Sequence, residues 1–141
     1  MSFLLDTCFL AELIKPQPSP PVTDWLSATE DHLLFISVLT LGEIQKGISR
    51  LPDSAKRRRL QTWLDAEVPQ RFEDRCLPVT AAVALRWGQV QGEAYLKGRP
   101  VPVLDGLIAA TALVHDLTIV TRNTTDMTEC GARVLNPWGT V

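Results

Sequence analysis

The sequence lacks an apolar run of the roughly 20 residues that cross a bilayer, so we expect no membrane span. It also lacks a basic N-terminal segment followed by a long apolar stretch, so we expect no secretory signal and a cytoplasmic location. The three cysteines are odd in number and widely spaced, which argues against a disulfide framework and against a zinc site built from close pairs. With 14 Lys and Arg against 16 Asp and Glu, the net charge of −2 excludes a protein that coats nucleic acid by bulk charge. A nucleic-acid enzyme with a local basic surface remains compatible with it.

The 141 residues, 45% hydrophobic and 21% charged, suit one globular domain that spans residues 1–141. Apolar runs predict strands at residues 2–6, 33–38, 76–79, 117–121 and 133–135. Helical spacing and capping signals predict helices at residues 7–15, 23–30, 41–49, 54–67, 80–97 and 105–115. This alternation predicts an α/β fold with three layers, in which helices cover both faces of a mostly parallel sheet.

Four acidic residues stand where the predicted elements end or begin. Asp6 ends the first strand, Glu43 lies one turn into the helix after the second strand, and Asp105 starts a helix. Asp126 follows the 117–121 strand after a short loop. Ligands of such sheets bind beyond the carboxyl ends of the strands, so all four acids are expected at one edge of the sheet.

Each acid taken alone also has a purely structural explanation. Asp6 and Asp105 could be helix N-caps, Thr40 and Glu43 match a capping box, and Asp126 could belong to a turn or a cap. As a set, however, they lack an obvious cationic partner, and Glu43 and Asp105 stand among apolar residues. Two like charges about 4 Å apart repel by roughly 4 kcal/mol at an effective dielectric of 20, and a divalent cation removes that repulsion. Mg²⁺ prefers carboxylate and water ligands, so the set predicts metal-dependent hydrolysis of a phosphodiester.

The segments around these acids are more specific than the acids themselves. Residues 4–7, 37–48, 102–112 and 118–126 occur in the order found in the PIN-domain family, and the chain resembles its VapC/FitB-type branch. The resemblance implies the PIN-like three-layer sandwich and a Mg²⁺- or Mn²⁺-dependent endoribonuclease. Such an enzyme is the toxin of a type II toxin–antitoxin pair, cleaves RNA to leave a 5′-phosphate and a 3′-hydroxyl, and inhibits translation. The resemblance also implies a homodimer and a VapB-like antitoxin, with DNA bound only through the antitoxin complex.

The resemblance further implies roles for individual residues. Asp6, Glu43 and Asp105 would be the core metal ligands, and Asp126 would be a fourth acid that acts through water or a second ion. Hydrogen bonds from Thr7, Thr121 and Asn123 would support the site. Met127 departs from the family pattern, which often has an aromatic residue after the last acid, and methionine is a suitable core filler there.

Cations near these acids are candidates for contacts with RNA phosphates. Lys46, Arg50 and Arg122 flank Glu43 and Asp126 in the sequence, and Arg122 could instead pair with an acid across a dimer. For the basic run at residues 56–59, a solvated helix face is slightly favoured over a phosphate-binding ridge.

Other residues are expected to serve mainly in packing. Cys8 is expected in the core, as are Trp25, Trp63 and Trp87. Trp25 and Leu26 could instead line a groove for an antitoxin helix.

Two rival classes of function remain open at this point: a phosphatase or phospho-receiver domain of a related α/β fold, and a non-enzymatic subunit. A phosphatase of a related α/β fold needs a second aspartate two residues after Asp6, but Cys8 occupies that position. A phospho-receiver domain needs paired acids and a lysine that the sequence does not provide. A catalytically silent PIN-fold subunit of an antitoxin–DNA complex would not need the intact set of acids.

Overall fold

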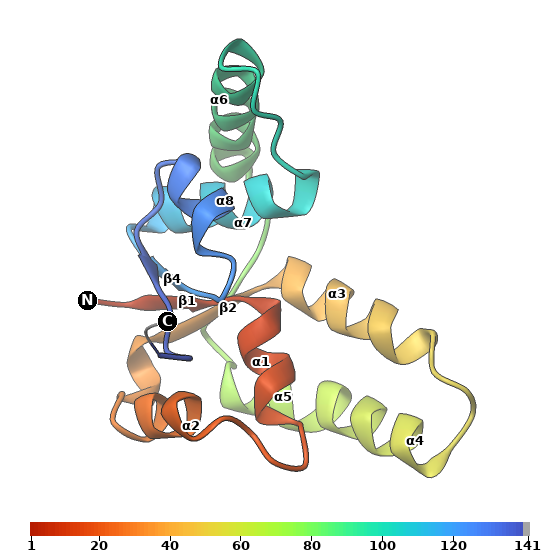
Figure 1. The fold of residues 1–141 in the computed structure, drawn as a ribbon. Coiled ribbons are helices and arrows are strands. Elements are labelled where there is room, and N and C mark those ends of the chain that lie inside the picture. The colour runs from red at the N-terminus through yellow and green to blue at the C-terminus, as the bar shows by residue number, and fades with distance from the viewer. Residues whose placement is uncertain (140–141) are drawn as a thin grey trace.

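A parallel sheet of five strands forms the centre of the molecule, and the computed structural model describes residues 1–139 (Figure 1). The strands are β1 (Phe3–Leu5), β2 (Leu34–Ser37), β3 (Cys76–Leu77), β4 (Thr118–Val120) and β5 (Val134–Leu135). Their order across the sheet is β3-β2-β1-β4-β5, and each neighbouring pair is parallel. The predicted strands and their parallel arrangement are therefore confirmed, and β1 lies at the middle of the sheet.

Helices cover both faces of this sheet, which confirms the predicted three layers (Figure 1). They are α1 (Thr7–Leu13), α2 (Pro20–Ser27), α3 (Val38–Ser49), α4 (Ala55–Thr62), α5 (Val68–Arg71), α6 (Ala81–Leu96), α7 (Val103–His115) and α8 (Thr124–Glu129). Helices α1 to α5 lie on one side of the sheet, and α6 to α8 lie on the other. Within residues 1–139, no helix is long and apolar enough to cross a membrane.

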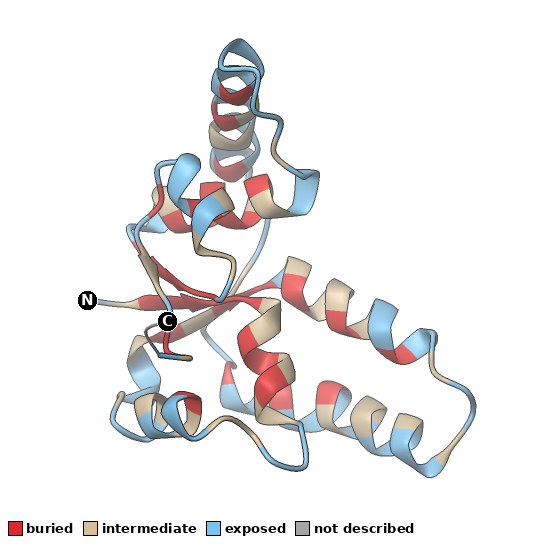
Figure 2. Cartoon of the chain, in the orientation of Figure 1, coloured by how far each residue is buried: buried red, intermediate tan, exposed pale blue. Residues whose placement is uncertain are grey.

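Alternation along the strands divides the hydrophobic core into two parts. In β1, Phe3 and Leu5 pack against the α1–α5 side, whereas Leu4 packs against α7 and its neighbours. In β4, Ile119 and Val120 divide in the same way. Successive strand side chains point to opposite faces, so a strand buried on both sides is apolar at every position. Figure 2 shows this continuous burial along the central strands.

Aromatic packing fixes the first layer of helices onto the sheet. The Trp25 ring meets Phe3 and Phe9 edge to face, with centroid distances of 5.0 and 5.6 Å. Trp63 packs against the same core, so the predicted core roles of these two tryptophans are confirmed. Trp87 lies between α6 and α7, close to the backbone of Gly106.

Helices α2 and α3 begin earlier in the chain than predicted. The second helix begins at Pro20 rather than at residue 23, because proline has no N–H to leave unpaired in a first turn. Helix α3 begins at Val38 and is capped by Ser37, whose hydroxyl accepts from the Leu39 amide at 3.0 Å. Thr40 therefore lies inside α3 and does not open it.

Three further differences concern helix extents. Helix α7 begins at Val103, so Asp105 lies in its first turn. The predicted 54–67 helix starts after Ser54 as expected but continues through a π-helical segment, η2 (Trp63–Glu67), into α5. Helix α8 was not predicted, because six residues are too few for an apolar periodicity to be visible.

We expect that Gly106→Ala destabilises the fold by about 1–3 kcal/mol, because a Cβ there would lie 2.8 Å from Gln91 Nε2 and 3.2 Å from the Trp87 ring. Gly92→Ala on α6 is the matched control, since no atom lies within 4 Å of its added Cβ. Alanine should stabilise that helix by up to about 1 kcal/mol. Urea unfolding of both variants checks this, and equal stability of the two would contradict the close packing of α6 on α7.

Candidate active site

Asp6 stands at the carboxyl end of the central strand and is held by two neighbours. Its Oδ1 accepts from the Thr7 amide at 2.8 Å, which makes Asp6 the N-cap of α1. Its Oδ2 accepts from the hydroxyl of Thr121 at 2.7 Å. Thr121 is fully buried and directly follows β4. The structural explanation as a cap is thus correct for Asp6, but the second hydrogen bond also fixes the carboxylate against the adjacent strand.

Glu43 reaches the same edge of the sheet from α3. The Thr7 hydroxyl donates to Glu43 Oε1 at 2.6 Å and lies 3.3 Å from the hydroxyl of Thr40. The capping-box explanation is wrong, because Ser37 caps α3 and places both Thr40 and Glu43 within the helix. Thr7 therefore links two of the four acids, through its amide to Asp6 and through its hydroxyl to Glu43.

Asp105 shows that the four acids are close enough to act on one another. Burial raises the pKa of this half-buried carboxyl, and the charges of Asp6, Asp126 and Glu43 raise it further. The Asn123 side-chain amide donates to Asp105 Oδ2 at 3.4 Å, and this hydrogen bond acts in the opposite direction by lowering the pKa. The pKa of Asp105 is thus raised above its ordinary value, first by burial and then by the like charges around it.

This charge lacks a paired cation in the part of the chain that the structure describes. Within residues 1–139, no Lys, Arg or His forms an ion pair with any of the four acids. In the same part of the chain, no three His, Cys, Asp or Glu side chains are gathered tightly enough to hold an ion. Oxygen donors without a compensating cation suit a hard divalent ion, although the side chains do not form a closed coordination sphere.

A buried carboxylate anchors the loop that carries Thr121 and Asn123. Glu12, only 4% exposed, accepts from Trp138 Nε1 at 2.9 Å, and this bond is the largest cause that lowers its pKa. Lys15, the Ser19 amide and Arg122 also donate to Glu12, at 3.1, 3.2 and 3.3 Å.

This anchor changes the interpretation of Arg122. The Arg122 guanidinium lies 4.4 Å from the ring of Trp138 and pairs with Glu12, so its partner is within the chain. Sequence reasoning missed Glu12 and Trp138. The available signal was an acid among the apolar residues of α1, where a charge needs a partner.

Other candidate residues lie in different surroundings. Cys8 is only half-buried, and its Sγ lies 3.7 Å from Asp6 Oδ2 and 3.6 Å from Thr121 Oγ1, beside the acids rather than in the core. Burial, followed by the charge of Asp6, raises the pKa of its thiol. Lys46 and Arg50 are exposed. Met127 is fully buried in the α7-side core, as expected of a filler.

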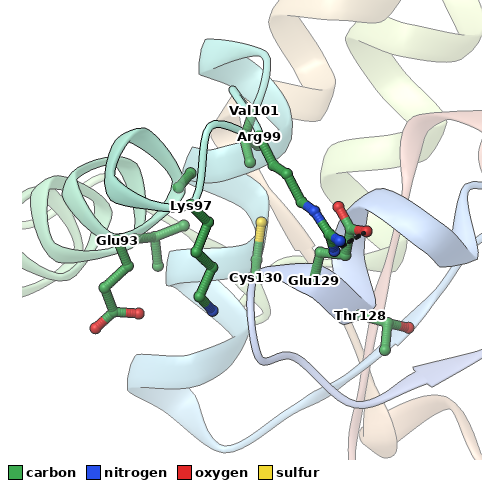
Figure 3. Close-up of a pocket in the computed structure, with 9 residues that line it drawn as sticks. Glu93, Lys97, Arg99, Val101, Thr128, Glu129 and Cys130 are labelled. Atoms are coloured by element: carbon green, nitrogen blue, oxygen red, sulfur yellow. Dashed lines mark hydrogen bonds and ion pairs between the residues drawn. The ribbon is translucent and has the colours of Figure 1, made fainter.

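A separate pocket of about 340 Å³ lies between the end of α6 and α8 (Figure 3). Two cations and two acids line it, namely Lys97, Arg99, Glu93 and Glu129. Arg99 pairs with Glu129 at 3.4 Å, as Figure 3 shows. None of the four acids at the sheet edge lines this pocket, and neither of its cations forms an ion pair with them among residues 1–139.

Residues 3–128, which include all four acids, match the family described as PIN domain. The chain belongs to the PIN domain family. This PIN domain is 33% identical over 135 residues to Toxin FitB of Neisseria gonorrhoeae, which covers 96% of this chain and 97% of the relative. It is 30% identical over 135 residues to VapC ribonuclease Y4jK of Sinorhizobium fredii, over 96% of each chain. The solved structure of FitAB bound to an IR36 DNA fragment superposes with a TM-score of 0.92 at 31% identity, over 99% of this chain and 97% of that one.

We expect Glu12→Gln to lower stability at pH 7, because the charge that Lys15 and Arg122 face is lost. The pKa of Glu12 is lowered from its ordinary 4.5 in the folded state. Its stabilising charge is therefore present above pH 4.5 and is lost as pH falls through the lowered value. Urea unfolding at pH 7 and at pH 4 should show the gap between variant and wild type shrinking at the lower pH. An equally wide gap at both pH values, or the same loss in the exposed control Glu73→Gln, would refute the role of the charge.

Asp105→Asn should raise stability in metal-free buffer, because it removes one of four mutually repelling charges. The site is half-exposed and solvent screens the repulsion, so the gain is expected to be about 1 kcal/mol or less. Thermal unfolding in EDTA measures it against Asp24→Asn on the exposed face of α2, which should leave stability unchanged. Destabilisation by Asp105→Asn would mean that its bond with Asn123 outweighs the repulsion.

Proposed function

We propose that this chain is a metal-dependent endoribonuclease and the toxin of a type II toxin–antitoxin pair. The observation that carries the proposal is the set of four carboxylates at the carboxyl edge of the sheet, none of which is paired with a cation among residues 1–139. The names of the relatives, a toxin and a ribonuclease, support the same function. Nucleases of the PIN domain family generally depend on divalent cations.

The proposed metal ligands are Asp6, Glu43 and Asp105, with Asp126 as a fourth acid that acts through water or a second ion. Mg²⁺ fits this all-oxygen set best, and Mn²⁺ is an alternative. Once bound, such an ion would supply an activated water and neutralise charge on the phosphate and on the leaving oxygen.

The remaining residues of the site would hold these ligands in place. Thr121 orients one oxygen of Asp6, and Thr7 ties Asp6 to Glu43. Asn123 holds Asp105 through its amide, and the Asn123 backbone N–H donates to the Thr121 hydroxyl at 2.9 Å. We propose that water attacks the phosphorus in line within this frame, so that the 3′-oxygen leaves and the products carry a 5′-phosphate and a 3′-hydroxyl.

The proposed partners are an antitoxin of the VapB type and, through that complex, DNA. The similar structure of FitAB bound to a DNA fragment supports this assignment. An apolar hollow of about 320 Å³, lined by residues that include Leu13, Leu26 and Trp63, is our proposed seat for an antitoxin helix. Leu26, one of the two residues predicted for such a groove, lines it, whereas Trp25 does not.

We also propose that the protein forms a homodimer and acts in the cytoplasm, where RNA is available to it. Apolar side chains exposed on α6 and α7 suit a contact between two copies, with Leu85, Leu96 and Val103 exposed by 72%, 83% and 59%. We further propose that residues 1–141 form one PIN domain. Strand β5 lies beyond the family match but pairs with β4 in the same sheet.

Cleavage of RNA by the purified protein should require a divalent ion and the acids. EDTA should abolish it, added Mg²⁺ or Mn²⁺ should restore it, and Asp6→Asn should lower the rate by at least about a hundredfold. Asp24→Asn is the control and should cleave at the wild-type rate. Mapping the RNA ends by sequencing, with and without phosphatase, checks the 5′-phosphate.

Two results would contradict the proposal. Unchanged cleavage in EDTA or by Asp6→Asn would exclude the metal mechanism at these acids. A wild-type protein that cleaves no RNA with either ion, yet joins an antitoxin on DNA, would favour the silent regulatory subunit.

A further inference from the structure

Helices α3 and α4 form an arm that projects from the body of the molecule, and we call residues 38–62 the α3–α4 arm (Figure 1). The two helices run side by side and contact each other through Gln45 and Gln61. The side-chain amide of each donates to the other, at 2.9 and 2.8 Å. The turn between the helices forms the tip of the arm, and the carboxylate site lies at its base, where Glu43 sits on α3.

The arm concentrates the positive charge of the chain. It contains six of the 14 Lys and Arg residues but only two of the 16 Asp and Glu residues, Glu43 and Asp53. The arm therefore has a formal charge of +4, and the rest of the chain has −6. A polyanion would be repelled by most of this protein and attracted by this one segment.

Four of the six cations are unengaged in the part of the chain that the structure describes. Arg57 donates to the Leu51 carbonyl at 3.1 Å, and Arg58 pairs with Asp53 at 3.1 Å. By contrast, four exposed cations make no ion pair or side-chain hydrogen bond among residues 1–139, namely Lys46, Arg50, Lys56 and Arg59. These charges are available to an external anion without breaking an internal contact.

The free cations of α3 continue directly from the carboxylate site. Glu43, Lys46 and Arg50 are spaced at i, i+3 and i+7, which places them on one face of the helix. Seven residues of helix correspond to about 10 Å, so this row leads from the acids to the tip of the arm. There the basic run at the start of α4 extends it.

The outer side of α4 adds an aromatic surface to the charge. Arg59 and Trp63, four residues apart, line an open hollow of about 580 Å³ along α4 and the following π-helical segment. Cations beside an aromatic ring suit a nucleic-acid strand, since the cations contact phosphates and a ring can stack with a base. The pocket of Figure 3 differs, because its Arg99 is paired with Glu129 and no aromatic side chain is among its lining residues.

We propose that the α3–α4 arm is a binding surface for the phosphate backbone of RNA that extends beyond the cleaved bond. Its free cations, including Lys56 and Arg59 of the basic run, contact successive phosphates and hold the strand against the acidic site. This inference rests on the proposed function, because it takes RNA as the substrate. RNA is favoured over an acidic protein because the row of cations leads to the carboxylates that the proposed function assigns to RNA cleavage.

Binding of RNA can be measured without cleavage. A fluorescent single-stranded RNA of about 20 nucleotides is titrated in EDTA, with anisotropy as the readout, at several salt concentrations. Lys56→Glu/Arg59→Glu should weaken binding at least about tenfold at low salt and make the dependence of log K on log [salt] shallower by about 1.4. Both positions are exposed on a helix, and thermal unfolding checks that the fold is retained.

The matched control is Lys97→Glu/Arg99→Glu, which makes the same change of charge at the pocket of Figure 3. It should retain near-wild-type affinity and salt dependence. Equal weakening in both double variants would overturn the proposal, because net charge alone would then govern binding. Poly-glutamate serves as a probe for an acidic protein partner. If Lys56→Glu/Arg59→Glu loses affinity for poly-glutamate but keeps its affinity for RNA, the proposal is overturned in favour of such a partner.

Cleavage then separates this inference from the proposed function. With Mg²⁺, the arm variant should cleave a 20-nucleotide RNA with a raised KM and a dinucleotide with an unchanged kcat/KM, since the dinucleotide does not reach the tip. An equal loss on both substrates would contradict the arm. If the wild type binds RNA through the arm but cleaves none, the proposed function fails and the binding surface stands.

Discussion

Repulsion among the carboxylates at the carboxyl edge of the sheet is the constraint on which the site depends. Burial and the charges of the other three acids raise the pKa of Asp105. A fold tolerates such crowding only if the surrounding structure holds the charges in place. Here Thr7 and Thr121 do so with hydrogen bonds of 2.6 to 2.8 Å, and the hydrophobic cores on both faces hold the strands that carry them.

The sheet could be predicted from the sequence because more than one feature of the sequence indicates the same strands. A strand buried on both faces is largely apolar, as β1 is at Phe3, Leu4 and Leu5. Short apolar runs therefore predicted the strands, and alternation with helices predicted their parallel arrangement. Helix α8 and the starts of α2, α3 and α7 were harder to predict from the sequence. The start of α3 depends on one capping contact, that of Ser37, and several residues nearby could serve equally well. Helices α2, α7 and α8 begin without a side-chain capping hydrogen bond, so no capping side chain marks their starts.

The acids of the site could be proposed from their positions where predicted strands end and helices begin, but not all of the residues that support them could be. Thr7 and Thr121 lie in recognisable motifs, whereas Glu12 and Trp138 are 126 residues apart and meet only in three dimensions. Their contact ties Arg122, and with it the loop between Thr121 and Asn123, to α1. The sequence marks Glu12 as a charge that needs a partner, but no local pattern identifies Trp138 as that partner.

The pairing of β1 with β4 has a consequence for the order in which the protein is made. Asp6 emerges from the ribosome early, but the strand beside it and the hydroxyl that orients it come more than a hundred residues later. A nascent chain that stops before β4 has neither, and it also lacks Asn123 and Asp126. The host's translation machinery therefore completes nearly the whole polypeptide before the acidic edge exists, which separates synthesis of this protein in time from any nuclease chemistry at that edge.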